Sequence, residues 1–282
     1  MFGSLQEAFS LLIRVPLVWT TGIIMGAAFG IDLMLEFSGE TFFAGKVLLF
    51  GLLVLPFFVA GALGAMHRKD GSLAAFLEEG KKGYFRVLLP AIVLVFAAAV
   101  TLLLLAAPVA LFTGESAVGA ISSAIMGVVL SFAFFAYFYD AAAVTEELGV
   151  FASIQRSAAL VFTDLWNVLL FYAANIAAFI GMGFAALFLL TALLYDKLAP
   201  IVESGETFAF DAVNATAAQA EFTAILGPDG IWATALVYAL FIAVFVPFTL
   251  AFKAAFYARH IREAEEEKVV GEYDEKGRWY RY

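Results

Sequence analysis

The sequence contains no cysteine among its 282 residues. This absence excludes a disulfide framework, a thiolate metal site and a cysteine nucleophile, and it leaves the redox compartment open. Histidine is also scarce, with two residues, and charged residues make up only 15% of the chain. The 16 basic and 25 acidic residues give a net charge of −9, which argues against a nucleic-acid-binding surface.

Catalytic motifs are missing as well. The two histidines do not form the His-Glu-x-x-His helix of a zinc protease. A Tyr-Asp pair occurs at Tyr139-Asp140 and at Tyr195-Asp196, but the chain has no Gly-x-Gly-Asp turn to supply the second carboxylate of an intramembrane aspartyl protease. It also lacks a rhomboid-like serine turn and a Gly-rich phosphate loop. We therefore expect a protein that is not an enzyme and carries no cofactor and no metal.

Apolar residues are abundant instead. The chain is 63% hydrophobic, contains 31 Phe and has a mean hydropathy of +0.94. Several apolar runs exceed about 18 residues, which is the length that crosses a bilayer as a helix. The sequence predicts an all-α integral membrane protein with one six-helix transmembrane domain at 1–258 and a charged cytoplasmic tail at 259–282. The expected spans lie at about 15–37, 47–66, 87–112, 117–139, 166–195 and 231–257.

Short amphipathic segments precede the helix pairs. They lie at 4–14, 72–86 and 150–163, and each is followed by two of the expected spans. Pro56 and Pro247 sit at comparable places in the second and sixth spans. This layout predicts three pseudo-repeats, each an interfacial amphipathic helix plus a helical hairpin, in which the even spans bend near their middle.

The stretch Tyr139–Trp166 has the clearest form of this unit. It reads as the end of a membrane helix, an acidic turn, an amphipathic helix and the start of the next span. Helical periodicity predicts that the amphipathic helix lies along the cytoplasmic membrane surface. Its expected apolar face consists of Val150, Phe151, Ile154, Ala158 and Val161.

The run Asp140–Ser157, DAAAVTEELGVFASIQRS, is followed by Leu160 and by Trp166-Asn167. This pattern resembles a broad group of uncharacterised prokaryotic six-helix membrane proteins, which are related to the membrane domain fused to some glycerophosphoryl diester phosphodiesterases. The soluble barrel of that enzyme and its metal-binding carboxylates are absent from this chain. The resemblance therefore implies a membrane module without assigned chemistry.

Ionisable side chains at membrane depth are candidate functional residues. Lys253 follows the Pro247 bend; we expect it to snorkel to the headgroups, and if it faces inward its partner should be Asp140. Glu146, Glu147 and Arg156 could form a second cytoplasmic cluster, and a solvated loop explains them equally well. In the first span, a stripe of small residues predicts close helix packing against a matching face of the second span. The stripe is Gly22, Gly26 and Gly30, and the matching face is Gly61 with Ala65.

Three classes of function remain open. The leading one is a non-enzymatic scaffold or accessory protein that binds membrane lipids, or a protein partner through its tail. The alternative is a transporter or permease for a small or lipid-like solute, and an intramembrane enzyme is third. A cavity that reaches mid-membrane and contains Lys253 or Asp140 would favour transport, whereas a packed interior would favour the scaffold.

The basic residues predict the orientation in the cell membrane. With a cytoplasmic N-terminus, all of the 16 basic residues except Lys46 and Lys197 lie inside. By the positive-inside rule, both termini are expected to be cytoplasmic.

Single-cysteine labelling tests this orientation directly, because the chain has no native cysteine. A cysteine introduced by Ser204→Cys should react with a membrane-impermeant maleimide only from outside the cell. One introduced by Ser72→Cys should react only from inside. Reversed accessibility of the two sites would contradict the predicted topology.

Overall fold

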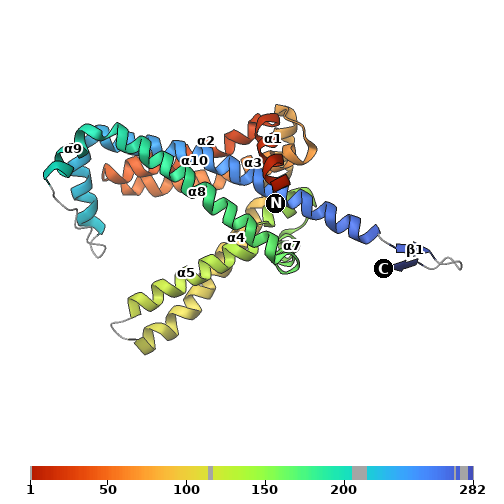
Figure 1. Cartoon of the computed structure of the whole chain (residues 1–282). Helices are drawn as coiled ribbons and strands as arrows, with labels where there is room; N and C mark the ends of the chain where they lie inside the picture. Colours follow the sequence, from red (N-terminus) through yellow and green to blue (C-terminus); the bar gives the residue numbers. More distant parts are fainter. Residues whose placement is uncertain (1, 114–116, 205–214, 270, 274–278, 282) are drawn as a thin grey trace. The chain divides into compact units, whose positions relative to one another are not determined.

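The computed structural model describes residues 2–113, 117–204, 215–269, 271–273 and 279–281. Nearly all of them are helical, and one short antiparallel strand pair lies near the C-terminus (Figure 1). The elements are α1 (Phe2–Arg14), η1 (Pro16–Val18), α2 (Trp19–Phe37), α3 (Thr41–Arg68), α4 (Leu73–Thr113), α5 (Ala117–Ala136), α6 (Tyr139–Thr145), α7 (Val150–Thr163), α8 (Leu165–Leu193), α9 (Tyr195–Ser204), α10 (Ala215–Val269), β1 (Gly271–Tyr273) and β2 (Trp279–Arg281).

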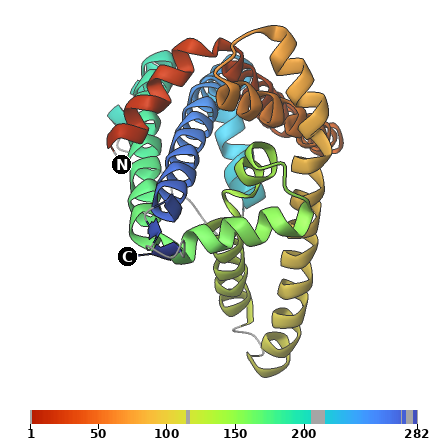
Figure 2. The same cartoon turned by 90° about the vertical axis from the view of Figure 1, so that its right-hand side faces the viewer.

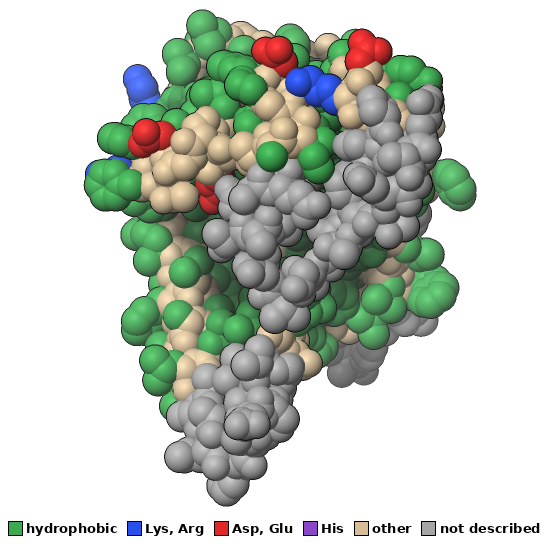
Figure 3. Space-filling view, turned by 90° about the vertical axis from the view of Figure 1, so that its left-hand side faces the viewer, with side chains coloured by type: hydrophobic (Ala, Val, Ile, Leu, Met, Phe, Trp, Pro, Cys, Tyr) green, Lys and Arg blue, Asp and Glu red, His purple; other side chains and the backbone are tan. Residues whose placement is uncertain are grey.

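Six helical stretches of the described chain are long and apolar enough to cross a membrane, which confirms the predicted all-α integral membrane fold with six transmembrane helices. Hydrophobic side chains accordingly make up most of the described surface on the face drawn in Figure 3. The stretches are Pro16–Phe37, Thr41–Arg68, Leu73–Leu105, Ser122–Thr145, Leu165–Leu193 and Thr223–Arg262. The amphipathic segment expected at 72–86 is not a separate helix, because α4 runs through it without a break.

The chain divides into two compact units. Unit 1 consists of Met1–Val15, Val59–Phe171 and Leu250–Tyr282, and unit 2 consists of Pro16–Phe58 and Tyr172–Thr249. In unit 1, α4 and α5 lie side by side as an antiparallel hairpin (Figures 1 and 2). Helix α10 continues past the predicted start of the tail at residue 259 and ends at Val269. The single domain at 1–258 and the three pseudo-repeats stay predictions.

In unit 2, the glycine stripe of α2 packs against α10. The contacts join Gly22 to Ala243 and Pro247, Gly26 to Ala239, and Gly30 to Ala239 and Ala235. Pro247 has no N–H, so the carbonyl oxygen of Ala243 lacks its helical partner, and the Cα of a glycine can approach it closely. The predicted partner face in the second span is wrong, because Gly61 of α3 lies against Phe76.

A second interruption of α10 also lies in unit 2. Gly227 has a φ of 62°, a conformation open to glycine, and Pro228 follows it. The carbonyl oxygen of Leu226 accepts a hydrogen bond of 2.6 Å from Nζ of Lys197 on α9. Residues 196–204 and 215–230, which lie between the expected fifth and sixth spans, are helical. The lysine satisfies a carbonyl freed by the kink.

The central stretch of unit 1 folds as its sequence predicts, with α6, an acidic turn, α7 and the start of α8 in that order. Ser157 of α7 forms hydrogen bonds with the backbone at the break between α5 and α6. Oγ of Ser157 accepts a hydrogen bond of 3.0 Å from the N–H of Phe138 and donates one of 2.8 Å to the carbonyl oxygen of Phe135. The backbone groups that the interruption of the helix frees thus find partners inside the protein.

Helices α1 and α7 bury the same pattern of positions. The buried residues are Ser4, Ala8, Leu11 and Leu12 in α1, and Ser153, Ser157, Leu160 and Val161 in α7. Both sets follow the spacing i, i+4, i+7 and i+8. Of the apolar face expected for α7, only Val161 is buried, and Phe151 is 75% exposed. The buried face of each helix thus combines a serine with aliphatic residues, whereas the aromatic rings of Phe9 and Phe151 are more than half exposed. An exposed aromatic face is what an interfacial helix would turn toward the bilayer.

The double role of Ser157 can be tested against a matched serine on the same helix. Ser157→Ala should lower the free energy of unfolding by about 1–3 kcal/mol, because the buried N–H of Phe138 and carbonyl of Phe135 lose their partner. Ser153 is equally buried, but its Oγ only donates to the carbonyl of Val150 within α7. Ser153→Ala should therefore cost clearly less. Equal losses for the two variants in thermal unfolding would contradict the role of Ser157.

Candidate functional site

A buried ion pair joins α10 to α6 within unit 1. Nζ of Lys253 lies 2.5 Å from Oδ2 of Asp140, and the two residues are only 7% and 6% exposed. The ammonium also lies 3.5 Å from the carbonyl oxygen of Tyr137 and 4.6 Å from the centre of its ring. The other carboxylate oxygen, Oδ1, accepts a 2.7 Å hydrogen bond from the N–H of Ala141. Each charge is thus compensated inside the protein.

The expectation that Lys253 snorkels is wrong, and the break between α5 and α6 explains why. At the interruption, the carbonyl oxygen of Tyr137 lies within reach of the ammonium, and Asp140 follows in the first turn of α6. Together they give the ammonium a carboxylate, a carbonyl and a ring face without the need to reach water.

Aromatic rings pack together beside this pair. Phe138, Phe171 and Phe252 are fully buried, and the ring centres of Phe171 and Phe252 are 4.7 Å apart. Phe138 lies 5.2 Å from Phe171 and 5.5 Å from Phe256. The cluster joins the break, the start of α8 and α10 of unit 1, and it excludes water from this side of the pair.

An apolar groove of about 640 Å³ ends at the ion pair. Its walls come from α4 between Ala91 and Leu102, and from α5 between Val129 and Ala136. At an axial rise of about 1.5 Å per residue, the α4 wall is roughly 16 Å long, about half of the hydrocarbon core of a bilayer. The polar side chains of its lining are Tyr137, Tyr139 and the two charged residues. The groove is therefore apolar along its length and polar at one end.

The predicted second cluster is only partly correct. Nε of Arg156 donates a 2.9 Å hydrogen bond to Oε1 of Glu146, so the structure brings these two together. The hydroxyl of Tyr257 on α10 donates to the same oxygen. Glu147 belongs to a different group, because it contacts Lys82 rather than Arg156.

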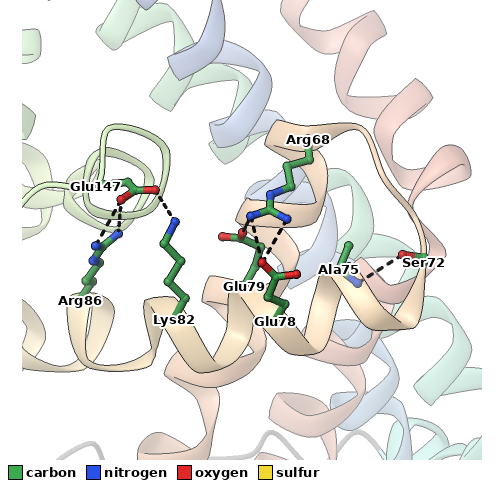
Figure 4. A network of polar contacts seen from close by, with 8 residues as sticks. All are labelled: Arg68, Ser72, Ala75, Glu78, Glu79, Lys82, Arg86 and Glu147. Carbon is green, nitrogen blue, oxygen red and sulfur yellow. Dashed lines mark hydrogen bonds and ion pairs between the residues drawn. The ribbon is translucent and has the colours of Figure 1, made fainter.

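Glu147 links the acidic turn to α4. It pairs with Lys82, and its Oε2 lies 3.3 Å from Nη1 of Arg86 (Figure 4). The hydrogen bond from Lys82 and its charge, followed by those of Arg86, lower the pKa of this carboxyl below its ordinary value. Its backbone has a φ of 55°, a left-handed conformation that residues other than glycine seldom adopt. The turn is therefore shaped so that its carboxylate meets two cations of α4.

The other end of this part of α4 is fixed to α3. Arg68, the last residue of α3, pairs with Glu78 at 3.4 Å and also with Glu79, which is only 6% exposed (Figure 4). Gly64 of α3 leaves the room that the Glu79 side chain occupies. Ion pairs thus hold the first turns of α4 to α3 on one side and to the turn after α6 on the other.

Sequence reasoning missed several residues of this region. Tyr137 and Ser157 were not identified because their contacts arise from the α5–α6 break, which no proline or glycine marks. Lys82 and Tyr257 lie far along the chain from their carboxylate partners, so spacing could not join them to the acidic turn. The aromatic residues and the proline that precede Lys253 in the sequence were the only local indication that this lysine faces inward.

The comparisons with known proteins give no further guide. The chain matches no protein-family model, no curated protein and no solved structure. The resemblance to the membrane domain of glycerophosphoryl diester phosphodiesterases therefore stays an expectation from the sequence.

A double-mutant cycle tests the buried pair. Lys253→Met should lower the free energy of unfolding in detergent by about 3–5 kcal/mol, because it strands the carboxylate of Asp140 in an apolar site. Adding Asp140→Asn should recover most of that loss, since no charge is then unpaired.

An exposed lysine of α4 supplies the control. Lys81→Met should change stability by less than about 0.5 kcal/mol, as expected for a surface substitution. A coupling energy below about 0.5 kcal/mol between Lys253 and Asp140 would contradict the pairing seen in the structure.

Proposed function

We propose that this multi-pass membrane protein is a non-enzymatic accessory protein that binds a lipid-like amphiphile in the groove between α4 and α5. The observation that supports the proposal is the shape and chemistry of that groove, which is apolar along both walls and ends at Asp140 and Lys253. An acyl or isoprenoid chain fits the apolar length, and a polar head fits the charged end.

Five of the fourteen described residues that line the groove are alanines. Ala91, Ala98, Ala99, Ala133 and Ala136 all contribute to it. Between two membrane helices, small residues ordinarily let the backbones approach and close the space. Here they leave about 640 Å³ between α4 and α5, a volume in the usual range of ligand pockets.

Transport of the same amphiphile is the second candidate. A cavity that contains Lys253 and Asp140 favours a transporter over a packed scaffold, but transport also needs a second conformation that opens to the other side of the membrane, whereas binding needs the groove alone. Buried charged pairs are costly in a membrane and are typical of substrate paths. A solute that enters the groove from the bilayer would reach a polar end near the membrane boundary, as a lipid carrier requires.

The proposed setting is the cell membrane with both termini in the cytoplasm. In that orientation, Asp140 and Lys253 lie toward the cytoplasmic end of their spans, and the groove extends from them toward the middle of the bilayer. Membrane lipids are then the nearest source of a ligand. A protein partner for the tail at 259–282 stays a prediction.

Photo-crosslinking tests the groove. The purified protein in lipid nanodiscs is irradiated with a palmitoyl chain that carries a diazirine at its middle, and the labelled peptides are identified by mass spectrometry. Labelling should concentrate on α4 between Ala91 and Leu102 and on α5 between Val129 and Ala136. Ala98→Phe should reduce it about tenfold or more, because the added ring fills the groove; an effect of this size equals about 1.4 kcal/mol of binding free energy.

The matched control is an alanine that lies outside the groove. Ala177 is an exposed alanine of α8, and Ala177→Phe should leave the labelling pattern unchanged. Labelling spread evenly over the lipid-facing helices, or unaffected by Ala98→Phe, would refute a binding role for the groove.

A further inference from the structure

We propose that the groove selects an uncharged amphiphile with a hydroxyl head, such as a monoacylglycerol, over an anionic or a cationic one. This inference rests on the proposed binding function and names the class of ligand. It follows from the charge and the unused hydrogen-bonding capacity of the groove's polar end.

The polar end is electrically neutral. Lys253 and Asp140 contribute one positive and one negative charge at 2.5 Å, and the other polar side chains of the lining, Tyr137 and Tyr139, are neutral. The neighbouring Glu146 and Arg156 neutralise each other through their own bond. No described side chain of the lining therefore offers a net charge to attract a headgroup of the opposite sign.

The pair also resists charged heads. An anionic head that bound Lys253 would either displace Asp140 or share the ammonium with it, and both arrangements leave a buried negative charge without a cation of its own. A cationic head that bound Asp140 would strand the ammonium in the same way. Because both residues are more than nine-tenths buried, water could not compensate the abandoned charge.

The pair can still accommodate a hydroxyl. The ammonium of Lys253 has three N–H donors, and the described contacts use one for Asp140 and one for the carbonyl of Tyr137. Each oxygen of Asp140 accepts one hydrogen bond in the structure and has a further lone pair. A hydroxyl both donates and accepts, so it can join the pair without breaking it.

A competition assay tests the selectivity. Palmitoylglycerol, palmitate and palmitoylcholine have the same acyl chain and differ in the charge of the head. Each is titrated against the diazirine probe on the purified wild-type protein in nanodiscs of uncharged lipid. Palmitoylglycerol should compete about tenfold better than either charged amphiphile, which corresponds to about 1.4 kcal/mol.

Charge-removing variants should change the preference in opposite directions. Asp140→Asn leaves an unpaired ammonium, so palmitate should become the best competitor. Lys253→Met leaves an unpaired carboxylate, so palmitoylcholine should become the best one. The double variant has no stranded charge and should keep the preference for palmitoylglycerol. If neither single variant folds, the ranking of the three competitors on the wild-type protein and on the double variant still tests the proposed selectivity.

Two contrary results have different meanings. If wild-type protein binds a charged amphiphile best, and Ala98→Phe abolishes that binding, the inference on the ligand class is overturned while the groove remains a binding site. If Ala98→Phe affects none of the three competitors, the proposed function fails as well.

Discussion

A backbone polar group inside a bilayer must find its partner within the protein, and Ser157, Lys197 and Lys253 meet this requirement where helices are interrupted. The break between α5 and α6 frees backbone groups that Ser157 and Lys253 engage. The kink at Gly227 frees a carbonyl that Lys197 engages. At both of these places, side chains from other helices of the same unit satisfy the freed backbone groups.

This requirement also explains how a charged pair can end an apolar groove. The small residues of α4 and α5 leave space between the two helices, and the interruption of α5 turns a backbone carbonyl and Asp140 toward that space. Lys253 then completes the polar end from α10. The same break thus determines where the apolar groove ends and which groups form its uncharged polar end. A mutation that affects the break would change both properties together.

The sequence predicted the features that depend on residues near each other in the chain. Six spans and the order of elements from Tyr139 to Trp166 follow from hydrophobic periodicity and turn residues, and the structure has both. The site depends on contacts between distant residues, such as Lys253 with Asp140. The break between α5 and α6, which Ser157 bonds, leaves no periodic pattern in the sequence. The inward direction of Lys253, which depends on that break, could therefore not be predicted. The glycine stripe was identified correctly, but its partner helix was not, because a stripe indicates close packing without naming the neighbour.

The backbone of Glu147 has a consequence for protein engineering. Its conformation suits glycine better than glutamate, yet the chain places its glycine two residues later, at Gly149, where φ is an ordinary −75°. A stabilising redesign that judges each position by backbone preference alone would choose glycine at 147. It would relieve the local strain and also remove the carboxylate that ties Lys82 and Arg86 to the turn. The variant would gain a relaxed backbone at 147 and lose the ion pairs that hold α4 to the turn. A melting temperature reports only the sum of the two effects and would not separate them.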